Sequence, residues 1–260
     1  MRHRVVDGLM STSWTHAEEA LFEKTGAAVL HGLKKVRNPA DLLGVIRQAH
    51  LEFDRAEAAA PAAARGAIAC RAGCGACCHV LVGVQAHEVL IVAEYIQTHF
   101  SPEELEVVIA RTAAQRAAFA GLAYADRWAL QRPCALLDED SCSVHEARPE
   151  ACRAHHSSDV EACHANFDAA EEKYDATIPG LHGRMFAVML AIDQGVVEAG
   201  LDGQAYDLGS ALHEALTDSH CAVRWMNGQK AFPDSCLEEG RAGPVAEAST
   251  IRPAGFFQEE

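Results

Sequence analysis

The sequence is poor in basic residues and contains no long apolar run. Its 260 residues include 22 lysines and arginines against 37 aspartates and glutamates, a formal net charge of −15. Such a surface repels phosphate groups, so nucleic acid and anionic membranes are not expected as partners. The most apolar run, residues 80–93, is interrupted by Gln85, His87 and Glu88 and is too short to span a bilayer.

Signals for export and for the common catalytic folds are also missing. No apolar segment follows the basic residues near the N-terminus, so residues 1–13 are predicted to be a loose leader rather than a secretory signal. The chain has no glycine-rich phosphate loop, no dinucleotide-binding fingerprint, no His-Glu-x-x-His and no nucleophile elbow. The sequence therefore leaves open whether the protein is an enzyme, and we expect it to be cytoplasmic, where thiols stay reduced.

Cysteine, in contrast, is abundant. Four of the ten cysteines lie within nine positions: Cys70, Cys74, Cys77 and Cys78. On a helix these side chains would share one face. Gly73 and Gly75 weaken a helix and favour a tight loop that enters one. In either case the four thiols converge, and converging thiolates need a cation.

A second series of cysteines follows: Cys134, Cys142, Cys152 and Cys163. The residues at 138–141 have the composition of a hairpin or turn. Arg148-Pro149 is typical of a helix start with Pro149 at its first position, which places Cys152 in the first turn, where the helix dipole favours a thiolate. Two cysteine groups far apart in sequence are the usual arrangement when a compact metal site joins two segments.

We therefore predict that these eight cysteines are metal ligands. Thiolates suit zinc, iron–sulfur clusters and Cu(I), and they do not suit magnesium or calcium. Eight cysteines could close two tetrahedral zinc sites, and a [4Fe–4S] cluster takes four. So many thiolates carry an excess of negative charge, and Arg71, Arg148 and Arg153 are predicted to lie near them and offset it.

Other uses of the cysteines stay open on the sequence alone. A disulfide scaffold explains an even number of cysteines but is typical of small secreted domains. A redox pair formed by the adjacent Cys77 and Cys78 is a further alternative. Cys221 and Cys236 stand alone in late segments and are predicted to pack as small apolar side chains.

Polar residues near the cysteines offer weaker candidates. Four histidines lie beside or shortly after cysteines: His79, His155, His156 and His164. Each could complete a mixed nitrogen and sulfur site, but each is expected to be a polar neighbour instead. Glu88 is expected at a solvated helix position, with a hydrogen bond back to the preceding loop as the alternative.

The spacing of apolar residues predicts a mainly α fold: an irregular cysteine-rich metal-binding core flanked by helical hairpins. Helices are expected near residues 15–33, 40–60, 86–100, 101–119, 181–196 and 208–216. No internal repeat and no sustained strand alternation is present. The predicted organisation is an N-terminal helical segment (1–66), a cysteine-cluster domain (67–175), a C-terminal helical extension (176–237) and a mobile tail (238–260).

The two cysteine series together resemble a known pattern. Cys70-xxx-Cys74-xx-Cys77-Cys78, followed by Cys134, Cys142, Arg148-Pro149-xx-Cys152-Arg153 and Cys163, is similar to the YkgJ-type cysteine-cluster family. The resemblance covers about residues 70–163 and implies a protein that chelates zinc or iron. The same cluster occurs in bacterial flagellin lysine N-methylases, which implies that some relatives carry an iron–sulfur centre.

Two functions are thus predicted side by side. The first is a metal-binding protein that holds zinc or iron through the eight cysteines, with the metal ion as its partner. The second is an iron–sulfur-dependent modification enzyme or electron carrier, related to protein lysine N-methylases, with a protein or peptide as a further partner. A thiol redox sensor that uses Cys77 and Cys78 is a weaker alternative.

Overall fold

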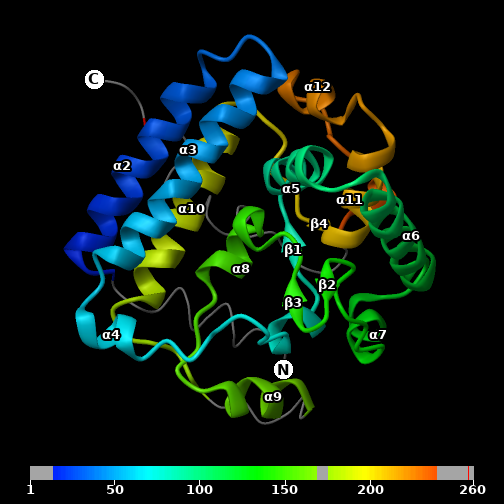
Figure 1. Cartoon of the computed structure of the whole chain (residues 1–260). Helices are drawn as coiled ribbons and strands as arrows, with labels where there is room; N and C mark the ends of the chain where they lie inside the picture. Colours follow the sequence, from blue (N-terminus) through cyan, green and yellow to red (C-terminus); the bar gives the residue numbers. More distant parts are fainter. Residues whose placement is uncertain (1–13, 169–174, 239–256, 258–260) are drawn as a thin grey trace.

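The computed structural model describes residues 14–168, 175–238 and 257, and it is mainly helical as predicted (Figure 1). The α-helices are α2 (His16–Leu33), α3 (Pro39–Ala58), α4 (Ala62–Gly66), α5 (Ala86–His99), α6 (Pro102–Phe119), α7 (Tyr124–Ala129), α8 (Glu150–Ala154), α9 (Val160–Asp168), α10 (His182–Glu198), α11 (Leu208–Thr217) and α12 (Cys221–Met226). The short strands are β1 (Gly83–Val84), β2 (Leu137–Asp138), β3 (Ser141–Cys142) and β4 (Tyr206–Asp207), and the 3₁₀ helices are η1 (Ala76–His79), η2 (His145–Ala147) and η3 (Asp234–Cys236). The predicted leader and tail lie outside the described residues, except for Glu238 and Phe257.

Helices α2, α3 and α10 pack together along one side of the molecule, with α2 and α3 forming a helical hairpin (Figure 1). Helix α2 begins where the sequence predicts, because Thr15 and Glu18 each accept the other's backbone N–H. Helices α2 and α10 approach closely at Gly195, where an added Cβ would lie 3.0 Å from the carbonyl oxygen of Gly26. This contact fixes the position of α10, whose Asp193 faces the interior and is 2% exposed.

Helices α5, α6, α11 and α12 form the other side of the molecule (Figure 1). Helix α11 packs against both α5 and α6, and α12 packs against α3 and α5. Ser101 caps α6 as predicted, since its hydroxyl accepts the Glu104 N–H. Strand β1 pairs antiparallel with β4, with Gly83 opposite Asp207, so the segment after the first cysteines is tied to the C-terminal part of the chain.

One continuous apolar core joins the two sides. Its largest fully buried side chains include Phe53, Leu136, Ile192, Trp225 and Phe232. Cys221 and Cys236 belong to this core with exposures of 1% and 0%, so the prediction that they pack as apolar side chains is confirmed. Within the described ranges, no helix combines the length and the apolar composition needed to cross a membrane.

Two details of the sequence prediction need correction. Residues 62–66, which lie outside the predicted helices, form the short helix α4, because alanine favours the helix once Pro61 has started it. Pro149 precedes α8 as its N-cap residue with extended ψ rather than occupying the first helical position. Cys152 nevertheless lies in the first turn of α8, as predicted.

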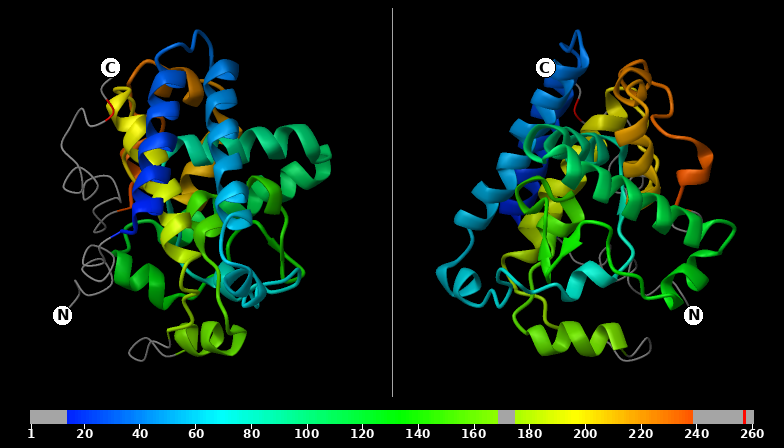
Figure 2. Two further views of the ribbon diagram at one scale, coloured as in Figure 1. Left: turned by 90° about the vertical axis from the view of Figure 1, so that its left-hand side faces the viewer. Right: turned by 45° about the vertical axis from the view of Figure 1, so that its right-hand side comes forward.

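The segments that carry the eight predicted ligands have little regular structure. They comprise the loop that ends in η1, the β2–β3 hairpin, α8 and α9. Helix α8 and the hairpin lie near the centre of Figure 1, whereas α9 lies at the bottom there and in both views of Figure 2. The hairpin is the one predicted at 138–141: Leu137 pairs with Cys142 and Asp138 with Ser141. Its turn residues Glu139 and Asp140 have φ of 43° and 61°, and the short polar side chain of Asp140 suits this left-handed conformation.

Candidate metal centre

The first four cysteines lie on a tight loop that enters a 3₁₀ helix, which confirms the predicted local structure. Gly73 supplies the left-handed backbone of the loop with φ of +80°. The Cys78 N–H donates to the Gly75 carbonyl oxygen at 2.9 Å, which starts η1. A Cβ on Gly75 would lie 3.3 Å from the carbonyl oxygen of Asp140, so glycine lets this loop pack directly on the hairpin.

Backbone hydrogen bonds join this loop to the second cysteine series. The Cys134 N–H donates to the Cys78 carbonyl oxygen at 2.7 Å. The backbone of Leu136 acts to lower the pKa of the Cys134 thiol, and the backbone of Val144 acts to lower that of the Cys142 thiol, although burial raises both pKa values overall. N–H groups aimed at sulfur favour the thiolate form that binds metal.

Cys70 is tied to the connection between α8 and α9. Its neighbour Ala69 donates a backbone N–H to the Ser157 carbonyl oxygen at 2.8 Å, and the Ser157 N–H donates to the Cys70 sulfur at 3.4 Å. Cys163, in the first half of α9, donates its thiol to the Asp159 carbonyl oxygen at 3.4 Å. Helix α9 also packs against η1. The first and last cysteines of the second series, Cys134 and Cys163, therefore both lie on segments that contact the segment of the first four cysteines.

The thiols of Cys77 and its neighbours interact electrostatically. A hydrogen bond with the Cys78 thiol lowers the pKa of Cys77 to about 6 and raises that of Cys78. Burial raises the pKa of Cys134 to about 11 and also raises that of Cys152, and in both cases the other thiols add to the shift. Thiols that raise one another's pKa values cannot all ionise without a compensating cation, so these residues fit a metal ion.

Taken together, these interactions form two groups that meet at Cys77. The thiol of Cys70 is influenced by those of Cys74, Cys77 and Cys163. The thiol of Cys77 influences in turn those of Cys78, Cys134, Cys142 and Cys152. Among the described residues, no three of these sulfur atoms all lie within 4.8 Å of one another, so a shared ion would draw them closer. All ten cysteines are free thiols.

The three arginines predicted near the thiolates differ in position. Arg148 lies close enough to Cys77 and Cys142 to lower the pKa of the Cys142 thiol, although burial raises that pKa overall. Arg153 donates to the carbonyl oxygen of Arg148 at 3.0 Å and interacts with Cys152. Arg71 is exposed. Arg148 is thus the arginine best placed to offset thiolate charge.

The histidines near the cysteines have partners of their own. The His79 Nδ1 lies 3.1 Å from the Gly75 carbonyl oxygen, and its ring packs against Phe167. The His156 Nε2 lies 3.7 Å from the Glu57 carboxylate, and His155 and His164 are exposed. These positions fit polar neighbours rather than ligands.

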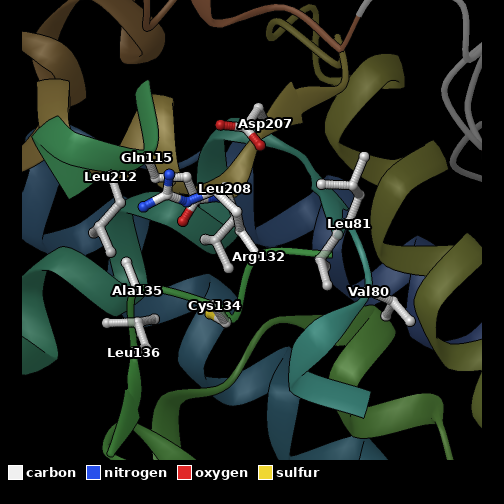
Figure 3. A pocket seen from close by; sticks show the side chains of 12 residues that line it. Val80, Leu81, Gln115, Arg132, Cys134, Ala135, Leu136, Asp207, Leu208 and Leu212 are labelled. Carbon is white, nitrogen blue, oxygen red and sulfur yellow. The ribbon is translucent and has the colours of Figure 1, made fainter. Parts of the chain in front are cut away.

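A pocket opens beside Cys134, between the first cysteine segment and α11 (Figure 3). Its walls are mostly apolar, with Val80, Leu81, Ala135 and Leu212 among the lining residues. The polar side chains that line it are Gln115, Arg132 and Asp207. Cys134 is the one cysteine among the described residues that line this pocket.

Glu88 is buried, so the expectation of a solvated position is wrong. It is 5% exposed, while the alternative hydrogen bond is present: the Gln85 N–H donates to its carboxylate at 2.6 Å. Its other oxygen accepts the Glu150 N–H at 2.7 Å. Burial and the neighbouring Glu150 raise the pKa of Glu88 to about 7. Glu88 therefore links α5 to α8 through Glu150, which lies two residues before Cys152.

Comparison with known proteins identifies the cysteine segment. Residues 69–175 match the model of the CxxCxxCC family, which is described as "Putative zinc- or iron-chelating domain". No curated protein and no solved structure matches the chain. The match confirms the resemblance that the cysteine spacing indicates, and it includes all eight predicted ligands.

Proposed function

We propose that the chain holds zinc or iron through the thiolates of its eight clustered cysteines, because residues 69–175 match the model of a family described as "Putative zinc- or iron-chelating domain". The observation that carries this proposal is that hydrogen bonds hold the two cysteine series together: the Cys134 N–H donates to the Cys78 carbonyl oxygen at 2.7 Å, and the Ser157 N–H donates to the Cys70 sulfur at 3.4 Å. A metal bound there supplies a positive charge that stabilises several thiolates at once. Backbone N–H groups and Arg148 stabilise the remaining negative charge.

We infer that Cys77 is a shared ligand at the junction of the two groups. Cys163, in contrast, acts on the thiol of Cys70. Loss of Cys77 should therefore remove metal from both groups, whereas loss of Cys163 should remove it from one. This role requires reduced thiols, which fits the cytoplasmic location expected from the sequence.

Metal analysis of protein purified without oxygen tests the proposal. The wild type should contain zinc or iron, Cys163→Ser should contain less, and Cys77→Ser should contain least. Cys236→Ser is the matched control, because Cys236 is buried in the apolar core away from the cluster and its loss should leave the metal content unchanged. Metal-free wild-type protein, or full metal content in Cys77→Ser, would contradict the proposal.

A second candidate function is an iron–sulfur-dependent modification enzyme or electron carrier. The observation that favours it is the pocket beside Cys134, where Arg132 and Asp207 could orient a substrate next to a metal centre. Iron bound by thiolates with sulfide gives a brown protein with visible absorption. Colourless protein that keeps stoichiometric zinc after anaerobic reconstitution with iron and sulfide would rule this candidate out.

A further inference from the structure

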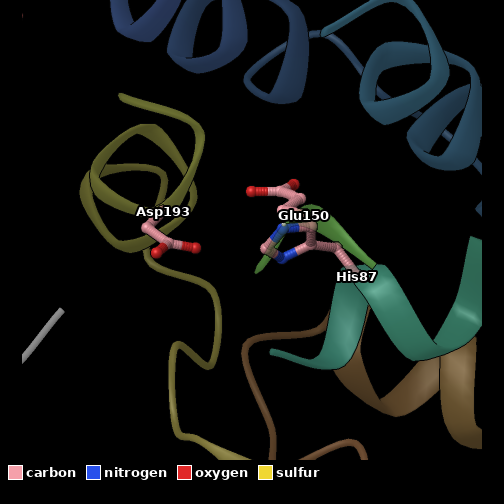
Figure 4. Close-up of side chains that lie close together, drawn as sticks. All are labelled: His87, Glu150 and Asp193. Carbon is pink, nitrogen blue, oxygen red and sulfur yellow. Dashed lines mark hydrogen bonds and ion pairs between the residues drawn. The ribbon is translucent and has the colours of Figure 1, made fainter. Parts of the chain in front are cut away.

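A second group of ligand-type side chains lies in the interior, where helices α5, α8 and α10 meet. His87, Glu150 and Asp193 each offer one ligand atom, and these atoms all lie within 4.8 Å of one another. In Figure 4 the Asp193 carboxylate points from α10 toward the imidazole of His87 and the carboxylate of Glu150. The three residues are 0%, 1% and 2% exposed, respectively. None is a cysteine, and none belongs to the centre described above.

The hydrogen bonds of this group leave ligand atoms unused. Glu150 Oε1 lies 2.9 Å from the Nε2 atoms of both His50 and His87. Glu150 Oε2 and His87 Nδ1 are fully buried and have no hydrogen-bond partner. Within the described part of the chain, no hydrogen-bond donor and no basic side chain pairs with the Asp193 carboxylate. Unpartnered buried atoms of this kind cost free energy, which a bound cation would recover.

Hydrogen bonds from neighbouring residues orient Glu150, as is typical of a carboxylate that binds a metal ion. The His50 imidazole contacts its carboxylate, and the Glu88 carboxylate accepts its backbone N–H at 2.7 Å. Glu88 is itself fixed by the Gln85 N–H. Ligating carboxylates in metal sites are typically oriented by such hydrogen bonds. The cluster also buries three carboxyl groups, on Glu88, Glu150 and Asp193, and Arg153 is the nearby cation that acts on Glu150.

We propose that His87, Glu150 and Asp193 bind one divalent first-row transition metal ion, at a site separate from the cysteines. One imidazole and two carboxylates are ligands that suit zinc, iron(II), manganese(II) and cobalt(II) rather than the thiolate-seeking Cu(I). The ion would take up the unpartnered oxygen of Glu150 and the free carboxylate of Asp193, and it would neutralise the buried charge. The proposal does not depend on metal at the cysteine centre.

Cobalt(II) distinguishes the two sites in one full-length protein. Bound to thiolates it gives intense near-ultraviolet charge-transfer absorption, and bound to nitrogen and oxygen alone it gives only weak visible bands. Metal-free wild type, Asp193→Asn and Asp126→Asn are each titrated anaerobically with Co²⁺, and bound cobalt is counted after removal of the free ion. Asp193→Asn preserves the side-chain volume, and Asp126→Asn is the control, because it removes an exposed aspartate on α7.

We expect Asp193→Asn to bind about one cobalt ion per chain fewer than wild type, with unchanged near-ultraviolet absorption. Asp126→Asn should match wild type in both measurements. Unchanged cobalt content in Asp193→Asn would overturn the proposal. A parallel loss of the charge-transfer band would overturn it too, because Asp193 would then support the thiolate centre instead of a separate ion. A wild type without that band refutes the cysteine centre but leaves this test valid, since the loss of weak visible bands can still be followed.

Discussion

Replacement of Gly195 by alanine tests how closely α2 and α10 pack. An added Cβ would lie 2.9 Å from Val29 Cγ1 and 3.0 Å from the carbonyl oxygen of Gly26. The valine side chain can turn aside, but the carbonyl oxygen is part of the backbone of α2 and cannot move alone. Overpacking of this kind typically costs about 1–3 kcal/mol of folding free energy.

The same substitution carries an opposing gain. Alanine in a helix interior is favoured over glycine by about 1 kcal/mol. We therefore expect Gly195→Ala to lower the free energy of unfolding by about 1 kcal/mol. Gly44→Ala in α3 is the matched control, because its Cβ would meet only the guanidinium of Arg47 at 3.8 Å. This control should gain about 1 kcal/mol.

Urea unfolding of the metal-free variants, followed by circular dichroism, measures both effects. The difference between the two variants removes the helix propensity that they share and leaves the packing cost, which we expect to be about 2 kcal/mol. Equal slopes of free energy against urea would show that the denatured states are comparable. If Gly195→Ala stabilises the protein as much as Gly44→Ala does, the close contact of α2 and α10 is refuted.

Two further predictions concern charge. Arg148→Gln removes a cation that lowers the pKa of the Cys142 thiol, and it should weaken metal binding about 10- to 100-fold in a chelator competition assay. Arg37→Gln, on the exposed connection before α3, should have no effect. Equal affinities in the two variants would contradict the role of Arg148. The His220 backbone N–H and the Arg224 guanidinium lower the pKa of Asp218 from 3.8 to about 2. The ionised carboxylate therefore stabilises the folded state fully when the pH is above 3.8, and this stabilisation is lost as the pH falls through 2. Asp218→Asn should therefore be less stable than wild type at neutral pH, and the difference should shrink in acid; a difference that is the same at all pH values would show that ionisation is not its cause.

The sequence predicts the helices and the cysteine region well because both depend on local spacing. The capping residues Thr15 and Ser101 start α2 and α6 as expected. The hairpin at 138–141 and the loop of Cys70–Cys78 also have the predicted form, since glycine and polar turn residues determine short-range backbone geometry. That the eight thiols act as ligands stays a prediction, which metal analysis of the cysteine variants tests.

The interior group of His87, Glu150 and Asp193 is not predictable from local spacing. Its members are separated by 63 and 43 positions, counted from their residue numbers, so no motif joins them. The one signal in the sequence is that a charged residue follows Ile192 within the apolar stripe of α10, at a position that the packing then buries. The prediction of a solvated position for Glu88 is wrong for the same reason: its burial depends on a distant part of the chain. A glutamate near a helix start is ordinarily solvated, but α8 covers this one.

The pairing of β1 with β4 has a consequence for the order in which the protein can form. Gly83 and Val84 follow the first four cysteines directly, yet their strand partners are Asp207 and Tyr206. During synthesis the cysteine segment therefore leaves the ribosome long before β4, the strand that pairs with β1. Contacts between such distant positions form late in folding, because closing a long loop costs entropy before the contact stabilises anything. The segment that follows the first four cysteines can therefore reach its final position only after residues 206 and 207 have been made.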